Sequence, residues 1–389
     1  MDTRKLLFVD DEPDLLVIVE QQFEGKIFEF NVEVIFAENG VEAIKKLEEH
    51  PEIEVVLSDI NMPIMDGLEF LGRANKLDRL LKIVMVSAYS DMTNIRKAMN
   101  RGAYDFITKP IDFEDLQETI ARVLRNVDQI KLEAAELNRL KKIEKEMEMA
   151  RKIQSSILPS SFTPFIQSTS FEIFGTMIPA RIVGGNFYDF FPIGPDKLVV
   201  TIGETAEKGM PAALYISSAR EAIRGFASSN QPIPECLKEI NNYLFYQKRD
   251  DVPNMTLGLF FGIFDINLGK LEYCIVNLPS PLLISKDGEI KELSSEKATA
   301  LGASLESTYT AKQLTLTKDD CLALFTNGII TAKNKNNEIY ANKLQDLLNS
   351  NHALPLQGLI DKVILDVRTF IAPAEQVEDY VILCLKYKG

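Results

Sequence analysis

The first 124 residues of the chain alternate short apolar runs with stretches of helical periodicity. The apolar runs are residues 5–9, 32–37, 55–57, 83–86 and 106–108. Between them, apolar residues recur every three or four positions, as at Val41, Ile44 and Leu47. Strands and helices that alternate in this way form a doubly wound sheet with helices on both faces. The sequence therefore predicts an α/β domain at residues 1–124, with five parallel strands and five helices.

Polar residues follow the carboxyl ends of these predicted strands, where open parallel sheets place their ligand sites. They are Asp10 and Asp11 after the first run, Asp59 after the third, Ser87 at the end of the fourth and Lys109 after the fifth. The carboxylates can hold Mg²⁺, because this hard cation prefers oxygen ligands. In such a site Asp59 attacks a phosphoryl donor, while Lys109 and Ser87 bind the transferred oxygens. The pattern predicts a magnesium-assisted phosphoacceptor site.

These positions also carry a family resemblance. The segments Asp10-Asp11, Ser58-Asp59-Ile60-Asn61-Met62-Pro63, Ser87-Ala88 and Lys109-Pro110 closely resemble the response-regulator receiver family. An isolated Asp most often ends a strand and caps a turn, but five matching positions in order favour the functional interpretation. The resemblance implies that Asn61 gives its backbone carbonyl to the metal and that Ser87 and Phe106 reposition on phosphorylation. It also implies a sensor histidine kinase or a phosphotransfer protein as partner.

A stretch without Gly or Pro follows, at residues 123–157, and is predicted to form one long helix. Its apolar seam is Val123, Val127, Ile130, Ala134, Leu137, Leu140, Ile143, Met147, Ala150, Ile153 and Ile157, with a slip in the heptad spacing after Leu137. We interpret residues 125–160 as a helical coiled-coil linker through which the chain forms a homodimer. The alternative is a solvated helix that packs on its own domain.

The remaining residues, 161–389, predict a second α/β domain. Strand-like runs lie at residues 198–202, 257–264, 271–276 and 322–325, and helical stretches lie at residues 211–226 and 233–245. This mixture is typical of an α/β sandwich.

Four landmarks in this part of the chain are similar, in order and spacing, to the stage II sporulation E type of metal-dependent (PPM) serine/threonine phosphatases. They are Gly184-Gly185-Asn186-Phe187-Tyr188-Asp189, Gly209-Met210-Pro211-Ala212-Ala213-Leu214, Thr326-Asn327-Gly328 and Glu378-Asp379-Tyr380. The stretch 143–159, which contains Ala150-Arg151-Lys152-Ile153-Gln154, also resembles the helix that enters this family's domain. The resemblance implies a fold in which aspartates hold two metal ions that activate water against a phosphoserine or phosphothreonine.

The residues at the family's metal positions differ from the family pattern. The aspartates expected there fall on Asn186, Glu204, Asn327 and Glu378, and the glycine that follows in the second motif falls on Glu207. Amides remove ligand charge, and each Glu adds a methylene group, whereas Mg²⁺ demands near-ideal octahedral geometry. We therefore expect a degenerate domain, a pseudophosphatase, that binds no metal or binds Mg²⁺ or Mn²⁺ weakly.

An active domain remains the alternative. Asp189, Glu207 and Asp379 could contribute to a rearranged, manganese-tolerant site with residual phosphatase activity.

Charge and cysteine usage narrow the remaining function classes. A net charge of −14, and no basic helix, work against nucleic-acid binding, which needs clustered Lys and Arg. Four widely spaced cysteines among apolar neighbours predict reduced thiols, and the N-terminal residues fit neither a signal peptide nor a membrane span. We expect a cytoplasmic protein without a membrane or nucleic-acid partner.

Two functional hypotheses result. In the first, phosphorylation of Asp59 controls a degenerate phosphatase-like domain that binds a protein. The resemblance implies partner switching around sigma-factor antagonists, or an adaptor that delivers a sigma factor for proteolysis. In the alternative, the chain is a receiver-gated, metal-dependent serine/threonine phosphatase.

Overall fold

The structure is a computed structural model that describes residues 3–23, 25–88, 92–159, 170–229, 231–248, 255–294 and 298–389. The chain divides into two compact units, Met1–Lys142 and Ile143–Gly389. The predicted boundary between residues 160 and 161 lies outside the described residues. Among the helices in the described ranges, none combines the length and the apolar character needed to cross a bilayer.

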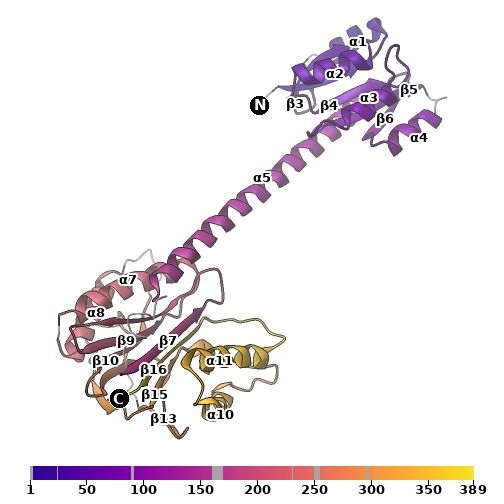
Figure 1. Cartoon of the computed structure of the whole chain (residues 1–389). Coiled ribbons are helices and arrows are strands. Elements are labelled where there is room, and N and C mark those ends of the chain that lie inside the picture. Colours follow the sequence, from indigo (N-terminus) through magenta and orange to yellow (C-terminus); the bar gives the residue numbers. More distant parts are fainter. Residues whose placement is uncertain are drawn as a thin grey trace. The chain divides into compact units, whose positions relative to one another are not determined.

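The first unit is built on one sheet with the strand order β2-β3-β1-β4-β5-β6 (Figure 1). The strands are β1 Arg4–Val9, β2 Lys26–Ile27, β3 Phe30–Ala37, β4 Val55–Asp59, β5 Lys82–Ala88 and β6 Asp105–Lys109. The five predicted strands are present and pair in parallel. The predicted number of strands is wrong by one, because β2 pairs antiparallel with β3 at the sheet edge. A strand of two residues is too short to produce a periodic pattern.

Helices cover both faces of this sheet, as predicted. They are α1 Pro13–Phe23, α2 Gly40–Glu49, α3 Gly67–Ala74, α4 Met92–Asn100 and α5 Phe113–Ile157. Successive residues of β1 point to opposite faces, so Leu7 packs with α2, α3 and α4 while Leu6 packs with α1 and α5. Asn39 starts α2 by accepting hydrogen bonds from the N–H groups of Val41 and Glu42.

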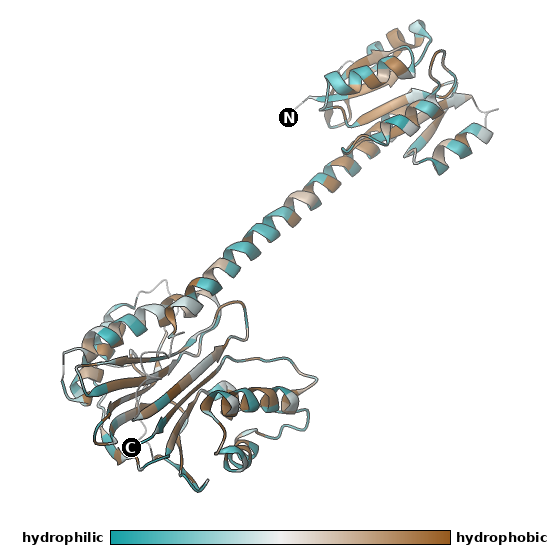
Figure 2. Ribbon diagram, in the orientation of Figure 1, coloured by the Kyte–Doolittle hydropathy of each residue, from teal (hydrophilic) through white to brown (hydrophobic). Residues whose placement is uncertain are grey.

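Helix α5 is a single helix of 45 residues that contains the predicted linker as far as Ile157. Its first part is buried in the first unit as far as Val127, so the predicted boundary after residue 124 falls within the helix. Beyond that point, hydrophilic residues dominate with apolar ones at intervals (Figure 2). The apolar side chains there are largely exposed, as for Leu137 at 53% and Leu140 at 56%.

The second unit contains two antiparallel sheets. The first has the order β14-β11-β10-β9-β8, and the second has the order β13-β12-β15-β16-β7. The strands are β7 Phe171–Ile178, β8 Asn186–Pro192, β9 Lys197–Glu204, β10 Gly258–Asp265, β11 Lys270–Val276, β12 Leu282–Ile284, β13 Ile290–Glu292, β14 Lys312–Thr315, β15 Cys321–Phe325 and β16 Tyr380–Tyr387. Their inner faces share one apolar core, in which Val200 and Phe260 of one sheet meet Leu383 of the other.

Helices cover the outer faces of both sheets (Figure 1). They are α7 Met210–Ala227, α8 Ile233–Tyr246, α9 Asn327–Ile330, α10 Ala341–Asn351 and α11 Leu356–Ile371. Helices α7 and α8 pack on the first sheet, and α9, α10 and α11 pack on the second. Helix α7 starts after Gly209, whose φ of 77° suits glycine, and has Pro211 in its first turn. The predicted α/β sandwich is confirmed, and all four cysteines are buried.

Candidate functional site

Three carboxylates gather at the carboxyl end of the first sheet. Strands β1 and β4 are parallel neighbours with Val9 opposite Ser58, so the residues that follow, Asp10 and Asp59, come side by side. One oxygen each of Asp10, Asp11 and Asp59 lies within 4.8 Å of the others. Asp10 and Asp59 are buried, whereas Asp11 is exposed. The sequence prediction placed these residues together, and the structure does so too. We call these three residues with Lys109 the first cluster.

Lys109, at the end of β6, supplies positive charge to this cluster. Its Nζ lies 2.7 Å from Asp59 Oδ2 and 2.9 Å from Asp10 Oδ2. Burial alone would lower the pKa of the Lys109 ammonium, but its hydrogen bonds to Asp59 and Asp10 outweigh burial and raise the pKa. Burial raises the pKa of Asp10, and Lys109 offsets part of that effect. Lys109 Nζ also contacts Glu12 Oε1 at 3.1 Å. Glu12 directly follows Asp10 and Asp11 in the sequence, but it was not among the predicted site residues.

The other predicted residues of the first unit lie around the same end of the sheet. The N–H of Asn61 donates to Asp59 Oδ1 at 3.2 Å. Ser87 stands on β5, one residue beyond the partner of Asp59, and its buried Oγ has no hydrogen-bond partner among the described residues. Phe106 on β6 is 37% exposed. A buried hydroxyl without a partner is costly unless it meets a ligand, so Ser87 fits a role in holding a phosphoryl oxygen. The carboxylate oxygens likewise fit Mg²⁺.

A second cluster forms at one end of the sandwich from residues of separate elements. Asn186 begins β8 and Glu204 ends β9, and the two are direct cross-strand partners. Asn327 begins α9, and its backbone N–H and side-chain Nδ2 both donate to Glu204 Oε2, at 2.9 and 3.1 Å. Burial raises the pKa of Glu204 to about 7, and the nearby charges of Glu378 and Asp379 add to this effect. The second cluster consists of these five residues.

Asp379 is held by backbone groups. Its Oδ1 accepts from the N–H of Ala180 at 2.8 Å, and its Oδ2 accepts from the N–H of Gly185 at 2.6 Å. Burial nevertheless raises the pKa of Asp379, although these hydrogen bonds oppose the rise. Asn186 Nδ2 approaches the backbone carbonyl of Asp379 at 3.5 Å. Each carboxylate oxygen of Asp379 therefore already has a donor from the chain itself.

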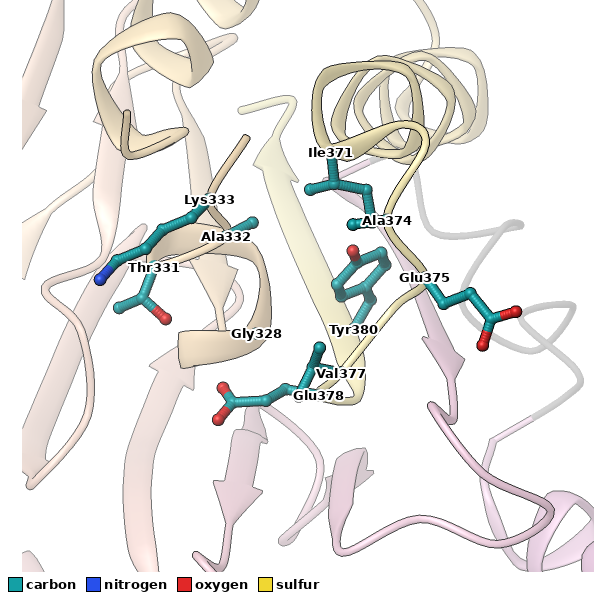
Figure 3. Close-up of a pocket in the computed structure, with 10 residues that line it drawn as sticks. All are labelled: Gly328, Thr331, Ala332, Lys333, Ile371, Ala374, Glu375, Val377, Glu378 and Tyr380. Atoms are coloured by element: carbon teal, nitrogen blue, oxygen red, sulfur yellow. The ribbon is translucent and has the colours of Figure 1, made fainter. Parts of the chain in front are cut away.

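Glu378 lies at the exposed side of the second cluster. Its side chain is 43% exposed, and its Oε1 is 3.8 Å from Lys208 Nζ. A cavity of about 260 Å³ adjoins it, between α9 and the segment that follows α11. Figure 3 shows the Glu378 and Glu375 side chains pointing in opposite directions at the edge of this cavity, with the Tyr380 ring between its walls. A second cavity, of about 610 Å³, starts at Asn327 and extends to α10.

The structure does not bring every predicted residue to the second cluster. Asp189 is fully buried on the opposite face of β8, where Arg224 donates to both of its oxygens at 2.7 and 2.8 Å. Arg220 Nε lies 3.0 Å from Asp189 Oδ2. The grouping of Asp189 with the site acids is therefore corrected: Asp189 anchors α7 to β8. Glu207 is exposed in the loop between β9 and α7.

The two units match two protein families. A family model described as stage II sporulation protein E matches residues 194–388, and one described as a response regulator receiver domain matches residues 6–121. The chemotaxis protein CheY of Listeria monocytogenes is 36% identical over 121 residues, which cover 31% of this chain and 98% of CheY.

Two further proteins resemble more than half of the chain. Protein IcfG of Synechocystis sp. is 26% identical over 267 residues, which cover 62% of this chain but only 41% of IcfG. The solved SiaA-PP2C domain of Pseudomonas aeruginosa superposes with a TM-score of 0.55 at 22% identity, covering 64% of this chain and 98% of that domain. At that identity, the similarity to SiaA concerns the fold alone.

Proposed function

Because the chain belongs to the stage II sporulation protein E family and also carries a response regulator receiver domain, we propose that phosphorylation of Asp59 controls an output unit that acts by binding a protein. The output unit has the phosphatase fold, and in this proposal it is a pseudophosphatase. The alternative, a receiver-gated phosphatase, keeps the same input and differs in the output chemistry.

The first cluster supports the input half of the proposal. The Asp59 carboxylate attacks the phosphorus of a phosphodonor, forming an acyl phosphate as the donor's leaving group departs. Mg²⁺ held by Asp10, Asp11, Asp59 and the carbonyl of Asn61 would neutralise charge on the phosphoryl group. Lys109 and Ser87 would bind phosphoryl oxygens. The donor is a sensor histidine kinase or a phosphotransfer protein.

The observation that carries the output half is the contact between Glu204 and Asn327. Two of the predicted metal positions hydrogen-bond to each other at 2.9 and 3.1 Å, so one carboxylate oxygen already has two donors. A metal ion at Glu204 would have to replace donors that the fold supplies, and it would need the Glu204 carboxyl to lose a proton whose pKa is about 7. Asn186 and Asn327 contribute no negative charge. The site therefore favours internal hydrogen bonds over a pair of divalent ions.

Cavities beside the second cluster suit a protein partner. Glu378 lines one of these cavities and Asn327 lines the other, and both cavities combine apolar and polar side chains. Partner surfaces commonly place a few polar groups among apolar ones. A component of a sigma-factor pathway, either an antagonist or the sigma factor itself, is our proposed partner class, by the family relationship.

The receiver-gated phosphatase is favoured by the acids that persist. Burial is the main cause of the raised pKa of Glu204, and the charges of nearby Glu378 and Asp379 add to the rise. Carboxylates that repel one another can be stabilised by a cation. If these three acids hold Mn²⁺, the unit would retain hydrolysis.

A phosphatase assay with Mn²⁺ on a phosphoserine peptide separates the two functions. We expect no turnover above background from the wild-type chain. Turnover that disappears in Glu204→Gln and persists in the exposed control Glu207→Gln would overturn the binding function. In parallel, a pull-down with acetyl phosphate should capture a partner differently for the wild type and for Asp59→Ala.

The exposed seam of α5 supports a homodimer, with one correction. Val123 and Val127 are buried in the first unit, so the seam that two copies could share begins after Val127. It includes Leu137, Leu140 and Ile153, each more than half exposed. Sedimentation of Leu137→Glu/Leu140→Glu, compared with the polar-face control Glu136→Gln/Arg139→Gln, should show loss of the dimer in the first variant alone. A wild-type monomer at high concentration would exclude this dimer.

A further inference from the structure

The last turns of α5 contact the glycine pair that precedes β8. Gln154 Nε2 donates to the backbone carbonyl of Gly184 at 2.7 Å, and the N–H of Gly184 donates to Gln154 Oε1 at 3.0 Å. The side-chain amide thus pairs with both hydrogen-bonding groups of one residue, as a neighbouring strand would. Two bonds fix the orientation of the glycine backbone more tightly than a single bond. Gln154 is partly buried, which limits competition from water.

The same glycine pair is bonded to the second cluster. The N–H of Gly185 donates to Asp379 Oδ2 at 2.6 Å, and the carbonyl of Gly185 accepts from the N–H of Thr205 at 3.1 Å. Thr205 directly follows Glu204, and Asn186 directly follows Gly185. Gln154 is therefore connected through two consecutive glycines to Asp379 by a hydrogen bond, and to Asn186 and Glu204 through their chain neighbours Gly185 and Thr205.

The glycine pair has almost no free space around it. A Cβ at Gly184 would come within 2.6 Å of Asp379 Oδ2, and a Cβ at Gly185 would come within 2.7 Å of the Glu207 carbonyl oxygen. Backbone packed this closely cannot yield sideways without displacing its neighbours. A shift of Gly184 would therefore be passed on to Asp379 and to the loop after β9.

We propose that Gln154 is a positioning residue for the second cluster, through which the end of α5 sets the arrangement of Asp379, Glu204 and Asn186. The inference rests on the proposed function, because it names how the receiver's state reaches the binding unit. A change in the rotation or tilt of the end of α5 alters the Gln154–Gly184 pair first. The next contact to change is the hydrogen bond from the Gly185 N–H to Asp379 Oδ2.

Other contacts hold the end of α5 in place independently of Gln154. Tyr188 Oη donates to the carbonyl of Pro159 at 3.0 Å, and Leu158 packs against both apolar cores that flank the first sheet of the second unit. A variant that lacks the Gln154 amide should consequently keep its helix docked. This separation makes the positioning role testable in a folded protein.

Hydrogen exchange on the full chain tests the proposal with three variants. Gln154→Leu removes both hydrogen bonds, and Gln154→Glu keeps the acceptor for the Gly184 N–H but loses the donor. Gln129→Leu is the matched control, because Gln129 lies on the same helix and its side-chain amide donates to Glu133 of that helix. We expect exchange at Gly184 to quicken about tenfold in Gln154→Leu, the loss that one hydrogen bond usually produces. In Gln154→Glu, the exchange rate at Gly184 should lie between those of the wild type and Gln154→Leu.

The decisive measurement is whether faster hydrogen exchange extends beyond Gly184 to the amides that bond to Asp379. Ala180 and Gly185 donate to Asp379 and have no bond to Gln154, so faster exchange at both in Gln154→Leu supports the positioning role. Faster exchange confined to Gly184, or equal changes in Gln129→Leu, would overturn it. The proposed function fails in a different experiment: if Asp59→Ala captures the same partner as the phosphorylated wild type, the input has no effect on binding, whatever Gln154 does.

Discussion

The two clusters differ in how their charges are satisfied. In the first, the ammonium of Lys109 faces Asp10, Glu12 and Asp59, with Asp11 close by, so negative charge is in excess. In the second, Asn327 donates to Glu204 and backbone N–H groups fill both oxygens of Asp379. Excess charge in a buried site draws in a cation, whereas acceptors with internal donors are already stabilised. This difference between the two clusters is the basis of our proposal that the output unit acts without a pair of metal ions.

The largest effect that would test this comparison is expected at Asp59. Asp59→Asn should eliminate acyl-phosphate formation from acetyl phosphate and Mg²⁺, because an amide oxygen is too weak a nucleophile. Intact mass and mobility-shift gels measure the product. Glu12→Gln, which alters a neighbouring contact of Lys109, should still be labelled. Labelling that persists in Asp59→Asn would place the acceptor elsewhere.

The next effect concerns an acid that the sequence grouped with the second cluster. Asp189→Asn removes the buried carboxylate that pairs with Arg220 and Arg224, and should cost about 3–5 kcal/mol in the free energy of unfolding. Glu221→Gln is the matched control, since Glu221 contacts the same Arg220 from an exposed position and should change stability by less than about 1 kcal/mol. Urea unfolding measures both. Similar small losses would contradict the anchoring role of Asp189.

Adding negative charge to the second cluster should strengthen its affinity for a divalent metal ion. Asn186→Asp/Asn327→Asp, made in an Asp11→Asn background to weaken the first cluster, should tighten Mn²⁺ binding by about 10–100-fold in calorimetry. The control Asn336→Asp/Asn349→Asp adds the same charge at exposed positions. Tight Mn²⁺ binding by the wild-type second cluster would contradict the proposed difference between the two clusters.

The smallest predicted effect is the pH dependence of Glu204. Burial raises its pKa from 4.5 to about 7, so the folded chain binds the proton more tightly than the unfolded chain does. This group's contribution to stability therefore declines as the pH rises from about 4.5 to about 7. Glu204→Gln should raise stability by about 2 kcal/mol at about pH 8 and little at about pH 5, as urea unfolding can measure. Glu207→Gln, which is exposed, should show no such difference, and equal effects at both pH values would contradict the assignment.

The sequence predicted the first unit in detail because strand ends and motif residues coincide there. Asp10, Asp59 and Lys109 follow apolar runs that became β1, β4 and β6, and parallel pairing was enough to bring them together. The strand β2 escaped prediction because two residues carry no periodicity. Glu12 escaped because its contact with Lys109 depends on a side-chain conformation rather than on a pattern.

The second unit was predicted well in fold and less well in its details. The motif positions placed Asn186, Glu204 and Asn327 together correctly. Asp189 does not join this group, because residues three apart on a strand face opposite sides and Asp189 therefore points away from Asn186. The hydrogen bonds that fill the oxygens of Asp379 come from Ala180 and Gly185, almost two hundred residues away, and only the folded chain reveals them.

The continuity of α5 limits which length changes evolution or engineering could make between Val127 and Gln154. Each added residue turns the downstream part of the helix by roughly 100° relative to the upstream part, so a two-residue insertion would change the helical phase between the buried Val127 and Gln154. Seven added residues restore nearly the original phase, within roughly 20°. Chimaeras that exchange input modules on this helix should accordingly work in steps of a heptad and fail between them.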